Sequence, residues 1–373
     1  MRSLASMKIL CITDQFENSN HSSIEGIFGT HLKELCTVYI VYFTKTSGSI
    51  RIKENKIYIP YSYKRKNITG ELNKIIDLNQ IDSVIARNFF PVLKDVLKNK
   101  GRYNYHVGFW HSFPHTFRRL FEAKEENRAV FRKAIEYKIK TYLEKKLVKK
   151  CDFLIVMSKE FKDTFYPDTD INYLPLPMGV NFNDLPSYKP DSNPIKKLIY
   201  TGTVDRLRKT DLIIEAISEL KEEFVLDIFT QSSNETTRKI KNMGDGRINV
   251  YPAIPRKELF NRIADYDIGI GLIPENDLYN VSSPTKTLEY YSIGVPALVN
   301  YLPEYTYLFN DESAFFCSFT KTDIQRAVKE ILNTPKEKIF EMGMKGRKIV
   351  KEQRDYRVLS EKLYNFLTNI YKQ

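Results

Sequence analysis

Residues 267–299 of the chain read DIGIGLIPENDLYNVSSPTKTLEYYSIGVPALV, and this stretch decides the fold. The apolar run 267–273 predicts a buried strand, and the apolar run 297–299 predicts a second one. Between them Ser283 is a good N-cap residue, because its hydroxyl can accept a hydrogen bond from a free backbone N–H, and Pro284 suits the first helical position. The stretch therefore predicts a βαβ unit, whose ligand crevice lies at the carboxyl ends of its strands.

The start of the predicted helix is suited to a negatively charged group. A helix N-terminus offers free N–H groups and the positive end of the helix dipole, which favour phosphate. Thr285 and Lys286 lie in the first turn, and Glu289 follows one and a half turns in, where it could accept hydrogen bonds from a group attached to that phosphate. An ordinary capped helix with only a structural role is the alternative interpretation of this segment.

Length and composition indicate a globular protein of two domains. The chain has 373 residues, which is long for one hydrophobic core, and 42% of them are hydrophobic. No apolar run is as long as a membrane span, and residues 1–6 lack the long apolar core of a secretory signal, so we expect a short extension before the first strand. The four cysteines are scattered without a Cys-x-x-Cys motif, which predicts buried free thiols and a reducing cytoplasm.

The net charge of +12 calls for an anionic partner. Nucleic acid, acidic lipid and a phosphorylated substrate all qualify. The chain has no nucleic-acid-binding motif and no basic stripe interleaved with aromatic residues, so we expect no nucleic acid and favour a membrane surface or a phosphorylated acceptor.

Apolar segments alternate with helix-like segments in the first half of the chain. This alternation predicts a parallel sheet with helices on both faces. The helix-like segments include 72–78 and 92–98. The expected strands are 8–13, 38–43, 56–61, 83–86, 105–109 and 153–157.

Two positions in this half are candidates for contact with a ligand. Gly26 lies in the loop after the first predicted strand, where a glycine lets the backbone approach a ligand. His111 follows the strand 105–109, at the edge of the sheet where a crevice is expected, and we prefer it to His115. A structural turn and a structural histidine are the alternatives.

Residues 117–150 form a strongly basic segment with twelve basic and five acidic residues. Its apolar residues recur at helical spacing, which predicts one amphipathic helix with a basic face. Part of this helix should pack on the sheet, and its excess of Lys and Arg predicts docking on an anionic membrane surface.

A second alternation of strands and helices begins after the Pro-, Asn- and Asp-rich linker 183–194. Residues 197–203 predict a strand that Gly202 ends, and Lys209 opens the next helix. The tail 356–371 predicts an amphipathic helix.

These motifs together resemble the GT-B glycosyltransferases, in particular glycosyltransferase family 4. Glu289 before the turn Gly294-Val295-Pro296 resembles the glutamate that holds the donor ribose in that family, and Arg208-Lys209 after Gly202 resembles its diphosphate-binding residues. Residues 177–181 (PMGVN) resemble the end of the family's first domain. The resemblance implies two Rossmann-like domains with parallel sheets facing a central cleft: 1–185 on the acceptor side, 186–353 for the nucleotide sugar, and a helix 354–373 that crosses back.

The resemblance also implies roles for single residues. His111, Glu289 and Lys209 would be the catalytic set, with His111 and the Gly26 loop facing the sugar and the attacking hydroxyl. Thr203 stands where many members have arginine, and Arg206 could replace it. No metal is expected, because cations and N–H groups would neutralise the phosphates. The implied donor site consists of Gly26, Gly202, Thr203, Arg206, Arg208, Lys209, Ser283, Pro284, Thr285, Lys286 and Glu289.

The predicted activity is transfer of a sugar from a nucleotide-diphosphate sugar to a glycan or lipid-linked acceptor. The resemblance favours assembly of bacterial surface polysaccharide, lipopolysaccharide or glycoprotein glycan, in the cytoplasm and peripherally on the inner face of its membrane. Family 4 members usually retain the anomeric configuration, but Val281 replaces their usual first glutamate, so inversion stays open.

Three alternatives remain. A metal-dependent GT-A transferase could use Asp168-Thr169-Asp170 as its metal-bridging motif. A GT-B nucleotide-sugar 2-epimerase would turn over the donor without an acceptor. A non-catalytic GT-B partner subunit would keep the fold without activity.

Overall fold

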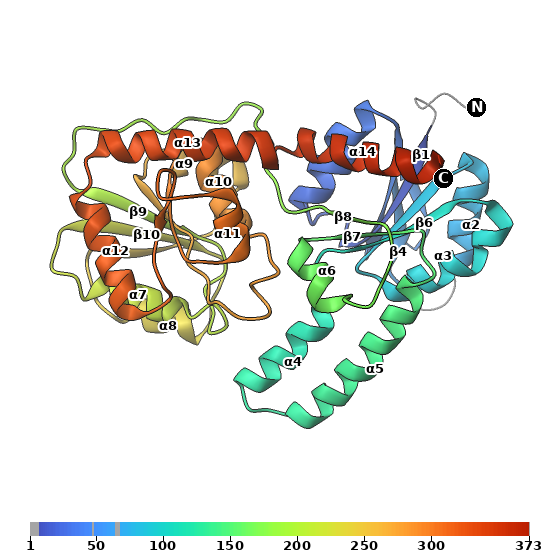
Figure 1. Cartoon of the computed structure of the whole chain (residues 1–373), viewed down its shortest axis with the longest axis horizontal. Coiled ribbons are helices and arrows are strands. Elements are labelled where there is room, and N and C mark those ends of the chain that lie inside the picture. Colours follow the sequence, from blue (N-terminus) through green and yellow to red (C-terminus); the bar gives the residue numbers. More distant parts are fainter. Residues whose placement is uncertain (1–6, 47, 64–67, 373) are drawn as a thin grey trace. The chain divides into compact units, whose positions relative to one another are not determined.

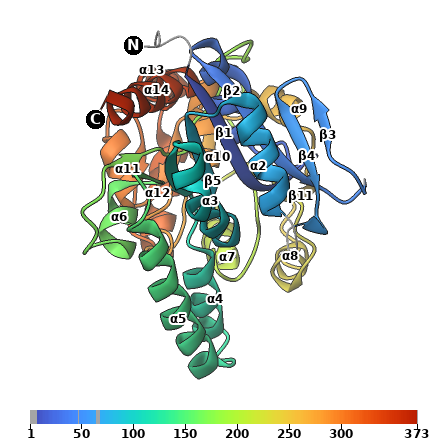
Figure 2. The same cartoon turned by 90° about the vertical axis from the view of Figure 1, so that its right-hand side faces the viewer.

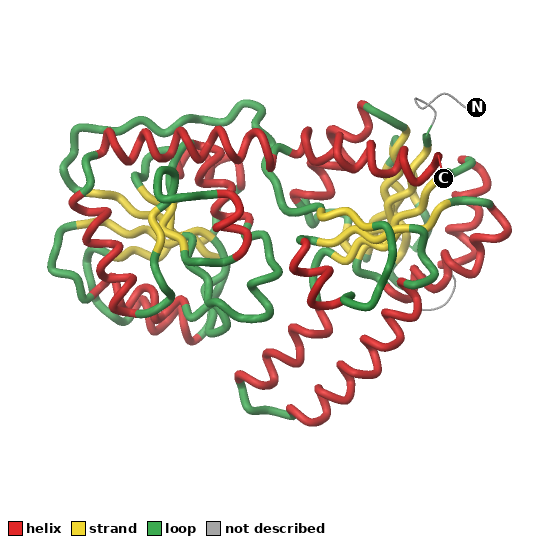
Figure 3. The backbone as a smooth tube through the Cα atoms, viewed as in Figure 1, coloured by secondary structure: helices red, strands yellow, loops and turns green. Residues whose placement is uncertain are grey.

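The computed structural model describes residues 7–46, 48–63 and 68–372. The chain forms two compact units. The first consists of Met1–Asn181 and Tyr356–Gln373, and the second of Phe182–Asp355. Both units are α/β sandwiches around a mainly parallel sheet, with helices covering the sheet faces (Figures 1 and 3). The predicted fold class, two Rossmann-like domains, is confirmed.

The first unit contains an eight-stranded sheet in the order β3-β4-β2-β1-β5-β6-β7-β8. All neighbouring strands pair in parallel except β3 and β4, which are antiparallel. The central strands are continuous apolar runs because helices cover both faces. The strands are β1 (Lys8–Phe16), β2 (Thr37–Thr44), β3 (Arg51–Lys53), β4 (Lys56–Pro60), β5 (Ser83–Arg87), β6 (His106–His111), β7 (Phe153–Val156) and β8 (Tyr173–Pro175).

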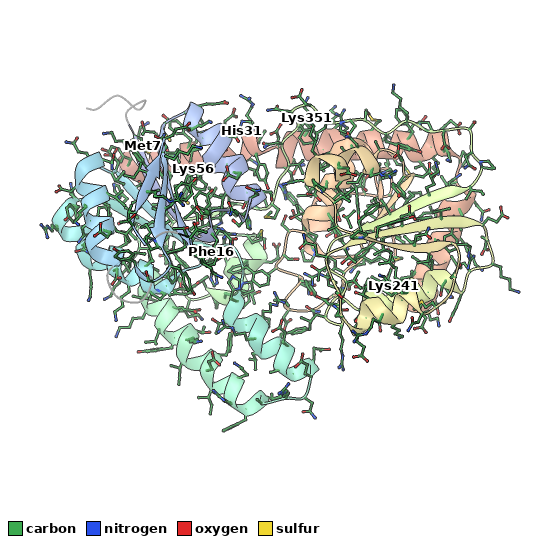
Figure 4. All side chains as sticks on the ribbon, turned by 180° about the vertical axis from the view of Figure 1, so that it is seen from behind. Met7, Phe16, His31, Lys56, Lys241 and Lys351 are labelled. Atoms are coloured by element: carbon green, nitrogen blue, oxygen red, sulfur yellow. The ribbon has the colours of Figure 1, made fainter. Side chains whose placement is uncertain are left out.

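Met7 and Phe16, labelled in Figure 4, mark the two ends of β1. The carboxyl edge of this sheet is therefore the edge at Phe16, and the parallel neighbours β5, β6 and β7 end at the same edge. The helical segments of the unit are η2 (Ile24–His31, a π-helix), η3 (Leu32–Glu34), α2 (Ile68–Asn79), α3 (Phe90–Tyr103), α4 (His115–Glu125), α5 (Val130–Val148), α6 (Lys159–Phe165) and α14 (Tyr356–Lys372).

The C-terminal helix α14 belongs to the first unit although the second unit precedes it in sequence. Its apolar side chains Tyr356, Leu359, Leu363 and Leu367 are buried in one cluster with Ile24, Ile27 and Phe28 of η2. Burial of this face follows from its helical spacing of apolar residues, as the tail of the sequence predicted.

The basic segment 117–150 is a helical hairpin and not the single helix that we predicted. Helix α4 ends at Glu125 and α5 begins at Val130. Between them Asn127 and Ala129 have positive φ angles of 47° and 52°, and such left-handed residues cannot continue an α-helix. The hairpin extends away from the carboxyl edge of its own sheet (Figures 1 and 2).

The second unit contains a six-stranded sheet in the order β11-β10-β9-β12-β13-β14, all parallel. Apolar side chains of its strands form one core with α7 and α12. The strands are β9 (Lys196–Thr201), β10 (Phe224–Thr230), β11 (Ile248–Pro252), β12 (Ile268–Ile270), β13 (Ala297–Val299) and β14 (Phe315–Phe316). The helices are α7 (Thr210–Ser218), α8 (Glu235–Lys241), α9 (Arg256–Ile263), α10 (Thr285–Ile293), α11 (Pro303–Leu308), α12 (Lys321–Asn333) and α13 (Lys336–Arg354).

Strand β12 is shorter than the strand 267–273 that the sequence predicted. It ends at Ile270, and three residues later the backbone N–H of Ile273 donates to the side-chain oxygen of Asn300 at 3.1 Å in place of a strand partner. Backbone pairing continues to Gly271, whose N–H donates to the Leu298 carbonyl at 2.8 Å, and beyond it the side chain of Asn300 takes over as partner. None of the helices in the described ranges is both long and apolar enough to cross a bilayer.

Candidate functional site

Helix α10 begins at Thr285, at the carboxyl edge of the second sheet, and its N-cap residue is Pro284. The prediction that Ser283 caps this helix is wrong. The Ser283 hydroxyl donates instead to the Glu304 carboxylate at 2.8 Å, because Glu304 and Arg354 form a buried pair behind it. Pro284 has no side chain that can cap α10, so among the described residues no cap hydrogen bond from the N-cap position occupies the helix start, which remains suited to an anion.

Lys286 occupies the first turn of α10 in an unusual environment. Its ammonium nitrogen is buried, makes no hydrogen bond to any residue that the structure describes, and lies 4.0 Å above the centre of the Tyr200 ring. Burial lowers the pKa of Lys286 well below its ordinary value, and the nearby charge of Arg208 lowers it further. A buried amine without a hydrogen-bonding partner is costly, so it is suited to receiving an anionic ligand.

Glu289 lies one turn further along α10 and forms an ion pair with Arg256 of α9, with Nη2 to Oε1 at 2.9 Å. The Glu289 side chain is only 13% exposed. Burial raises the pKa of Glu289, and the charge and hydrogen bond of Arg256 offset part of that increase. The carboxyl group predicted to hold a ribose is thus present beside Lys286, and Arg256 is a partner that the sequence analysis missed.

The loop after β9 provides the remaining cations. Gly202 has a φ of 116°, a value that suits glycine, so it turns the chain directly after Thr201. Within the loop Arg208 pairs with Asp205 at 2.5 Å and also bonds to it through its backbone N–H. The predicted donor residues Gly202, Thr203, Arg206 and Lys209 are all exposed.

Lys209 is the N-cap of α7, in the left-handed region with a φ of 46°. Its side chain forms no ion pair with any residue that the structure describes. A solvent-exposed cation held at a helix start is free to turn toward a phosphate. The strained backbone of a non-glycine residue here also marks the position as one worth testing.

Tyr290 fixes α10 against the sheet. Its hydroxyl accepts hydrogen bonds from the backbone N–H and the side chain of Thr201 at 2.8 and 3.2 Å. A Cβ atom on Gly269 of β12 would lie 2.1 Å from the Tyr290 ring, so only glycine lets this ring pass across the strand. This contact brings the start of α10 beside the end of β9, and therefore Lys286 beside Tyr200.

In the first unit, His111 is a buried residue at the end of β6. Its side chain is packed among the rings of Phe109, Phe161 and Tyr166, and its Nδ1 lies 2.7 Å from the Tyr166 hydroxyl. Burial lowers the pKa of His111 to about 3, so the ring is neutral. Of the two histidines considered, His115 is the exposed one, with 54% of its side chain accessible. The structure thus packs the His111 ring in the core and leaves His115 exposed, so His115 is a further candidate for contact with a ligand, while the role expected of His111 stays a prediction.

A polar cluster that the sequence analysis missed lies at the same carboxyl edge. Arg87 forms a buried ion pair with Asp14, and its Nη2 lies 3.0 Å from Nε2 of His21. Burial acts to raise the pKa of Asp14, but Arg87 and hydrogen bonds outweigh it and hold this pKa below its ordinary value. His115 Nε2 lies 4.0 Å from the Asp14 carboxylate.

The signal for this cluster was present in the sequence. Asp14 lies at the end of β1, Arg87 ends β5, and Ser112 directly follows β6. Polar residues where three adjacent parallel strands end meet at one edge of a sheet. Asn88 joins them by donating to Ser112 Oγ at 2.9 Å.

The structure gives a reason for glycine at position 26 other than the predicted approach of a ligand. A Cβ atom at this position would lie 2.2 Å from the ring of Tyr356 in α14. The glycine face that we expected to approach a ligand is therefore covered by the C-terminal helix. Gly26 thus makes room for the docking of α14.

The alternative metal motif lies in a loop between α6 and β8. Asp168 and Asp170 are exposed there, and Thr169 between them is buried. Among the residues that the structure describes, no group of three or more His, Cys, Asp and Glu side chains could hold a metal ion.

Comparisons with known proteins indicate one class of enzyme. Residues 208–364 match a family described as glycosyl transferase-like, which covers α10 and the residues around Lys286 and Glu289. No curated protein sequence matches the chain at a significant level.

Several solved structures share the whole fold. A glycosyltransferase from Rickettsia africae has a TM-score of 0.73 at 14% identity, with 99% of each chain covered. An E. coli structure titled trehalose-6-phosphate bound with UDP-2-fluoro glucose has a TM-score of 0.69 at 11% identity, covering 98% of this chain and 99% of that one.

The lipopolysaccharide outer core galactosyltransferase WaaB is also similar, with a TM-score of 0.66 at 12% identity, over 97% of this chain and 99% of that one. At these identities the structural likeness establishes the fold, and the family match adds the class of enzyme. The predicted fold and enzyme class are confirmed, and the metal-dependent GT-A alternative is excluded by the fold. The chain therefore has the fold of the GT-B glycosyltransferases, and its residues 208–364 carry the glycosyl transferase-like match that indicates the class of enzyme.

Proposed function

We propose that this transferase uses a nucleotide-diphosphate sugar, and that the second unit binds it at the start of α10. The observation that carries the proposal is the buried ammonium of Lys286 in the first turn of α10, which makes no hydrogen bond within the described part of the chain. A diphosphate placed there would accept hydrogen bonds from the free N–H groups and bring a counter-charge to Lys286. UDP is the first nucleotide to test, since a structure of the same fold is bound with UDP-2-fluoro glucose.

The remaining donor residues surround this position. Glu289 would accept hydrogen bonds from the ribose hydroxyls, with Arg256 holding its carboxylate in place. Arg208 and Lys209 would stabilise the charge of the diphosphate from the loop after β9, and Arg206 could contribute from the same loop. Donors and cations already in place where charge develops contribute strongly to catalysis.

The proposed reaction breaks the bond between the anomeric carbon and the diphosphate and forms one from that carbon to an acceptor hydroxyl oxygen. The diphosphate leaves with the bonding electron pair and takes up the proton of the acceptor. The cations named above do the work that a metal does in other transferases, so the proposed reaction is independent of metal. Retention of the anomeric configuration is the proposed outcome by analogy with family 4, with Val281 as the departure noted above.

The polar cluster of Asp14, Arg87 and His115 is the proposed acceptor-side site in the first unit. It offers a carboxylate, a guanidinium and an exposed imidazole at the carboxyl edge of a parallel sheet. Such groups suit the hydroxyls of a glycan, and similarity to a lipopolysaccharide galactosyltransferase supports a surface-glycan or lipid-linked acceptor. The excess of basic residues in 117–150 supports a site of action at the inner face of the cytoplasmic membrane.

Thermal unfolding with UDP, GDP, ADP, CMP and dTDP in buffer with EDTA tests the donor site. A nucleotide at a hundred times its dissociation constant adds about 2.7 kcal/mol of stability. We expect one nucleotide to raise the melting temperature of the wild type, and this increase to disappear in Glu289→Ala and in Lys286→Met. The matched control Lys241→Met, at the exposed end of α8 (Figure 4), should keep the increase.

Lys286→Met has a second expected effect that identifies the role of the ammonium. Without ligand the variant should be more stable than the wild type, because a buried amine without hydrogen bonds is replaced by an apolar side chain of similar length. Lower stability together with an unchanged nucleotide response would contradict the proposal.

Analysis of products separates the remaining alternatives. Turnover of the nucleotide sugar without any acceptor would identify a 2-epimerase. The absence of a melting response to every nucleotide, with or without manganese, would favour a non-catalytic partner subunit.

A further inference from the structure

The outer face of α5 differs from the surface of an ordinary solvated helix. Eight residues of this helix are exposed, and none of them is acidic. Three are cationic, namely Arg132, Lys138 and Lys146. The other five are the large apolar residues Phe131, Ile135, Ile139, Tyr142 and Leu143, with exposures of 81, 44, 56, 67 and 52%. We call these eight residues the outer face of α5.

The apolar residues of α5 do not pack on the sheet as the sequence analysis predicted in part. Their helical spacing predicted a stripe packed in part on the sheet, but the structure turns this stripe outward. At about 100° per residue all eight side chains fall within an arc of about 140°, so they form one continuous strip along the helix. Among the described residues eleven large apolar side chains are exposed, and α5 carries five of them, so the strip is a local concentration.

The acidic residues of α5 turn the other way. Glu136 forms ion pairs with Lys133 and Lys140 of the same helix and with Arg119 of α4. Glu144 accepts a hydrogen bond from Thr116 of α4 at 3.2 Å. The negative charges are thus neutralised or buried on the inner side of the hairpin. The exposed cations Arg132, Lys138 and Lys146 form no ion pair with any described residue, and Lys149 and Lys150 add two more exposed charges after the helix.

We propose that the outer face of α5 docks on an anionic lipid bilayer and inserts its apolar strip among the lipid headgroups. An apolar strip bordered by cations is the pattern of a helix that lies in the plane of a membrane interface. The apolar side chains gain from leaving water, and the cations gain from anionic headgroups. This inference deepens the proposed function, because it names the surface that would bring the enzyme to a lipid-linked acceptor, and it rests on that function only for the acceptor.

Charge favours a bilayer over a second copy of the chain. In a symmetric dimer through this face, Arg132, Lys138 and Lys146 would approach the same residues of the partner, without any exposed acid on the helix to offset them. An anionic bilayer supplies the missing negative charge along the whole strip. The tip of the hairpin projects from the first unit, so a flat surface can reach it (Figures 1 and 2).

The test uses the full chain with a tryptophan reporter, Phe131→Trp. The only natural tryptophan, Trp110, is 1% exposed in the core of the first unit and gives a constant background. Phosphatidylcholine vesicles containing phosphatidylglycerol should shift the reporter emission to the blue, and brominated lipids should quench it. Pure phosphatidylcholine vesicles should give at least tenfold weaker binding, and added salt should weaken binding to the anionic vesicles.

Two sets of variants separate insertion from simple charge attraction. Ile135→Ser with Ile139→Ser should weaken vesicle binding about tenfold or more, because two large apolar side chains are lost. Lys138→Gln with Lys146→Gln should weaken it about fivefold for each lysine. The matched controls are Ile52→Ser and Lys53→Gln on β3 of the same unit, both exposed, and they should bind as the wild type does.

The proposal is overturned if the serine variants bind vesicles as the wild type does, or if the tryptophan is neither shifted nor quenched. It is equally overturned if light scattering shows a dimer that the serine variants dissociate and no vesicle binding occurs. The nucleotide melting response reports the donor site without any membrane. A normal nucleotide response with no vesicle binding would therefore reject the membrane surface alone, and the reverse result would reject the donor site alone.

Discussion

The carboxylate of Glu289 on α10 and the guanidinium of Arg256 on α9 meet at 2.9 Å, with the carboxylate side almost enclosed. The pair links two helices at the proposed donor site. Burial raises the pKa of Glu289, and the charge and hydrogen bond of Arg256 act in the opposite direction and favour the anion. The proposed contact with ribose hydroxyls depends on that anion, so the pair connects the stability of the protein with its function.

Removal of Arg256 should destabilise the protein in a pH-dependent manner. Without the guanidinium the pKa of Glu289 rises further, and a raised carboxyl pKa means that stability is lost as pH rises through it. We expect Arg256→Met to lower the free energy of unfolding by roughly 1–2 kcal/mol at pH 8. This loss is smaller than that of a fully buried pair, because Arg256 is 40% exposed. At pH 5 the loss should be smaller still. Urea unfolding at the two pH values measures this difference.

In the double variant Arg256→Met, Glu289→Gln, most of the pH dependence of stability should disappear, since no carboxylate is then left unpaired. An equal loss of stability at both pH values would show that Arg256 acts by packing and not by its charge.

The pair of Arg354 and Glu304 should contribute strongly to the stability of the second unit. Both side chains are nearly inaccessible, at 6 and 7%, and two hydrogen bonds of 3.1 Å join them. Arg354→Met would leave a buried carboxylate without its cation, and we expect a loss of about 3–5 kcal/mol. Equilibrium unfolding in urea measures it, and the double variant Arg354→Met, Glu304→Leu should recover at least half. No recovery would show that the ion pair stabilises the folded protein more than the two apolar side chains that replace it.

His111 should make the protein sensitive to acid. The folded state keeps the ring neutral with a pKa of about 3, whereas the unfolded chain binds a proton below its ordinary pKa of about 6.5. Stability should therefore fall as pH decreases below 6.5, and this residue alone should contribute about 2 kcal/mol of the loss between pH 7 and pH 5.

The wild type is to be compared with the variant His111→Asn, whose amide can still bond to the Tyr166 hydroxyl but does not titrate. Its stability should be lower overall, because the smaller side chain leaves a cavity, and it should fall less steeply with decreasing pH. The same slope in both proteins would contradict the buried, neutral state. Enzyme assays of the same variant test the predicted contact of His111 with the sugar, because a loss of activity beyond the loss of folded protein would support that contact.

Gly26→Ala should loosen the C-terminal helix. The added methyl group would lie 2.2 Å from Tyr356, so the ring or α14 has to move, which costs about 1–3 kcal/mol. Gly101→Ala in α3 is the control, since nothing lies within 4 Å of its added Cβ, and an alanine in that helix should stabilise slightly. Melting temperatures give the first comparison.

A smaller side chain at position 356 should relieve the clash that an alanine at position 26 creates. In the background Tyr356→Leu, the change Gly26→Ala should cost less than it does in the wild type. Equal costs in the two backgrounds would show that Tyr356 is not the residue that requires glycine.

The sequence by itself was enough for the architecture and for placing the proposed donor site on it. Apolar runs bounded by glycine, proline and polar residues are local signals, so the alternation of strands and helices could be recognised, and with it the edge where α10 begins. Lys286 and Glu289 follow from the same local pattern, because residues of a helix's first turns share its N-terminal end, whereas Arg208 and Lys209 came from the family resemblance.

Only the tertiary structure decided which of these groups are paired, buried or free. Arg256 meets Glu289 from another helix, and Tyr200 covers the ammonium of Lys286 from a strand far away in sequence. Tyr166 and the rings of Phe90, Phe109 and Phe161 bury His111, while the apolar side of α5 faces away from the described core of its own unit. Burial and pairing depend on neighbours that meet in space, and helical or strand spacing shows only which residues share a face, not which face is covered.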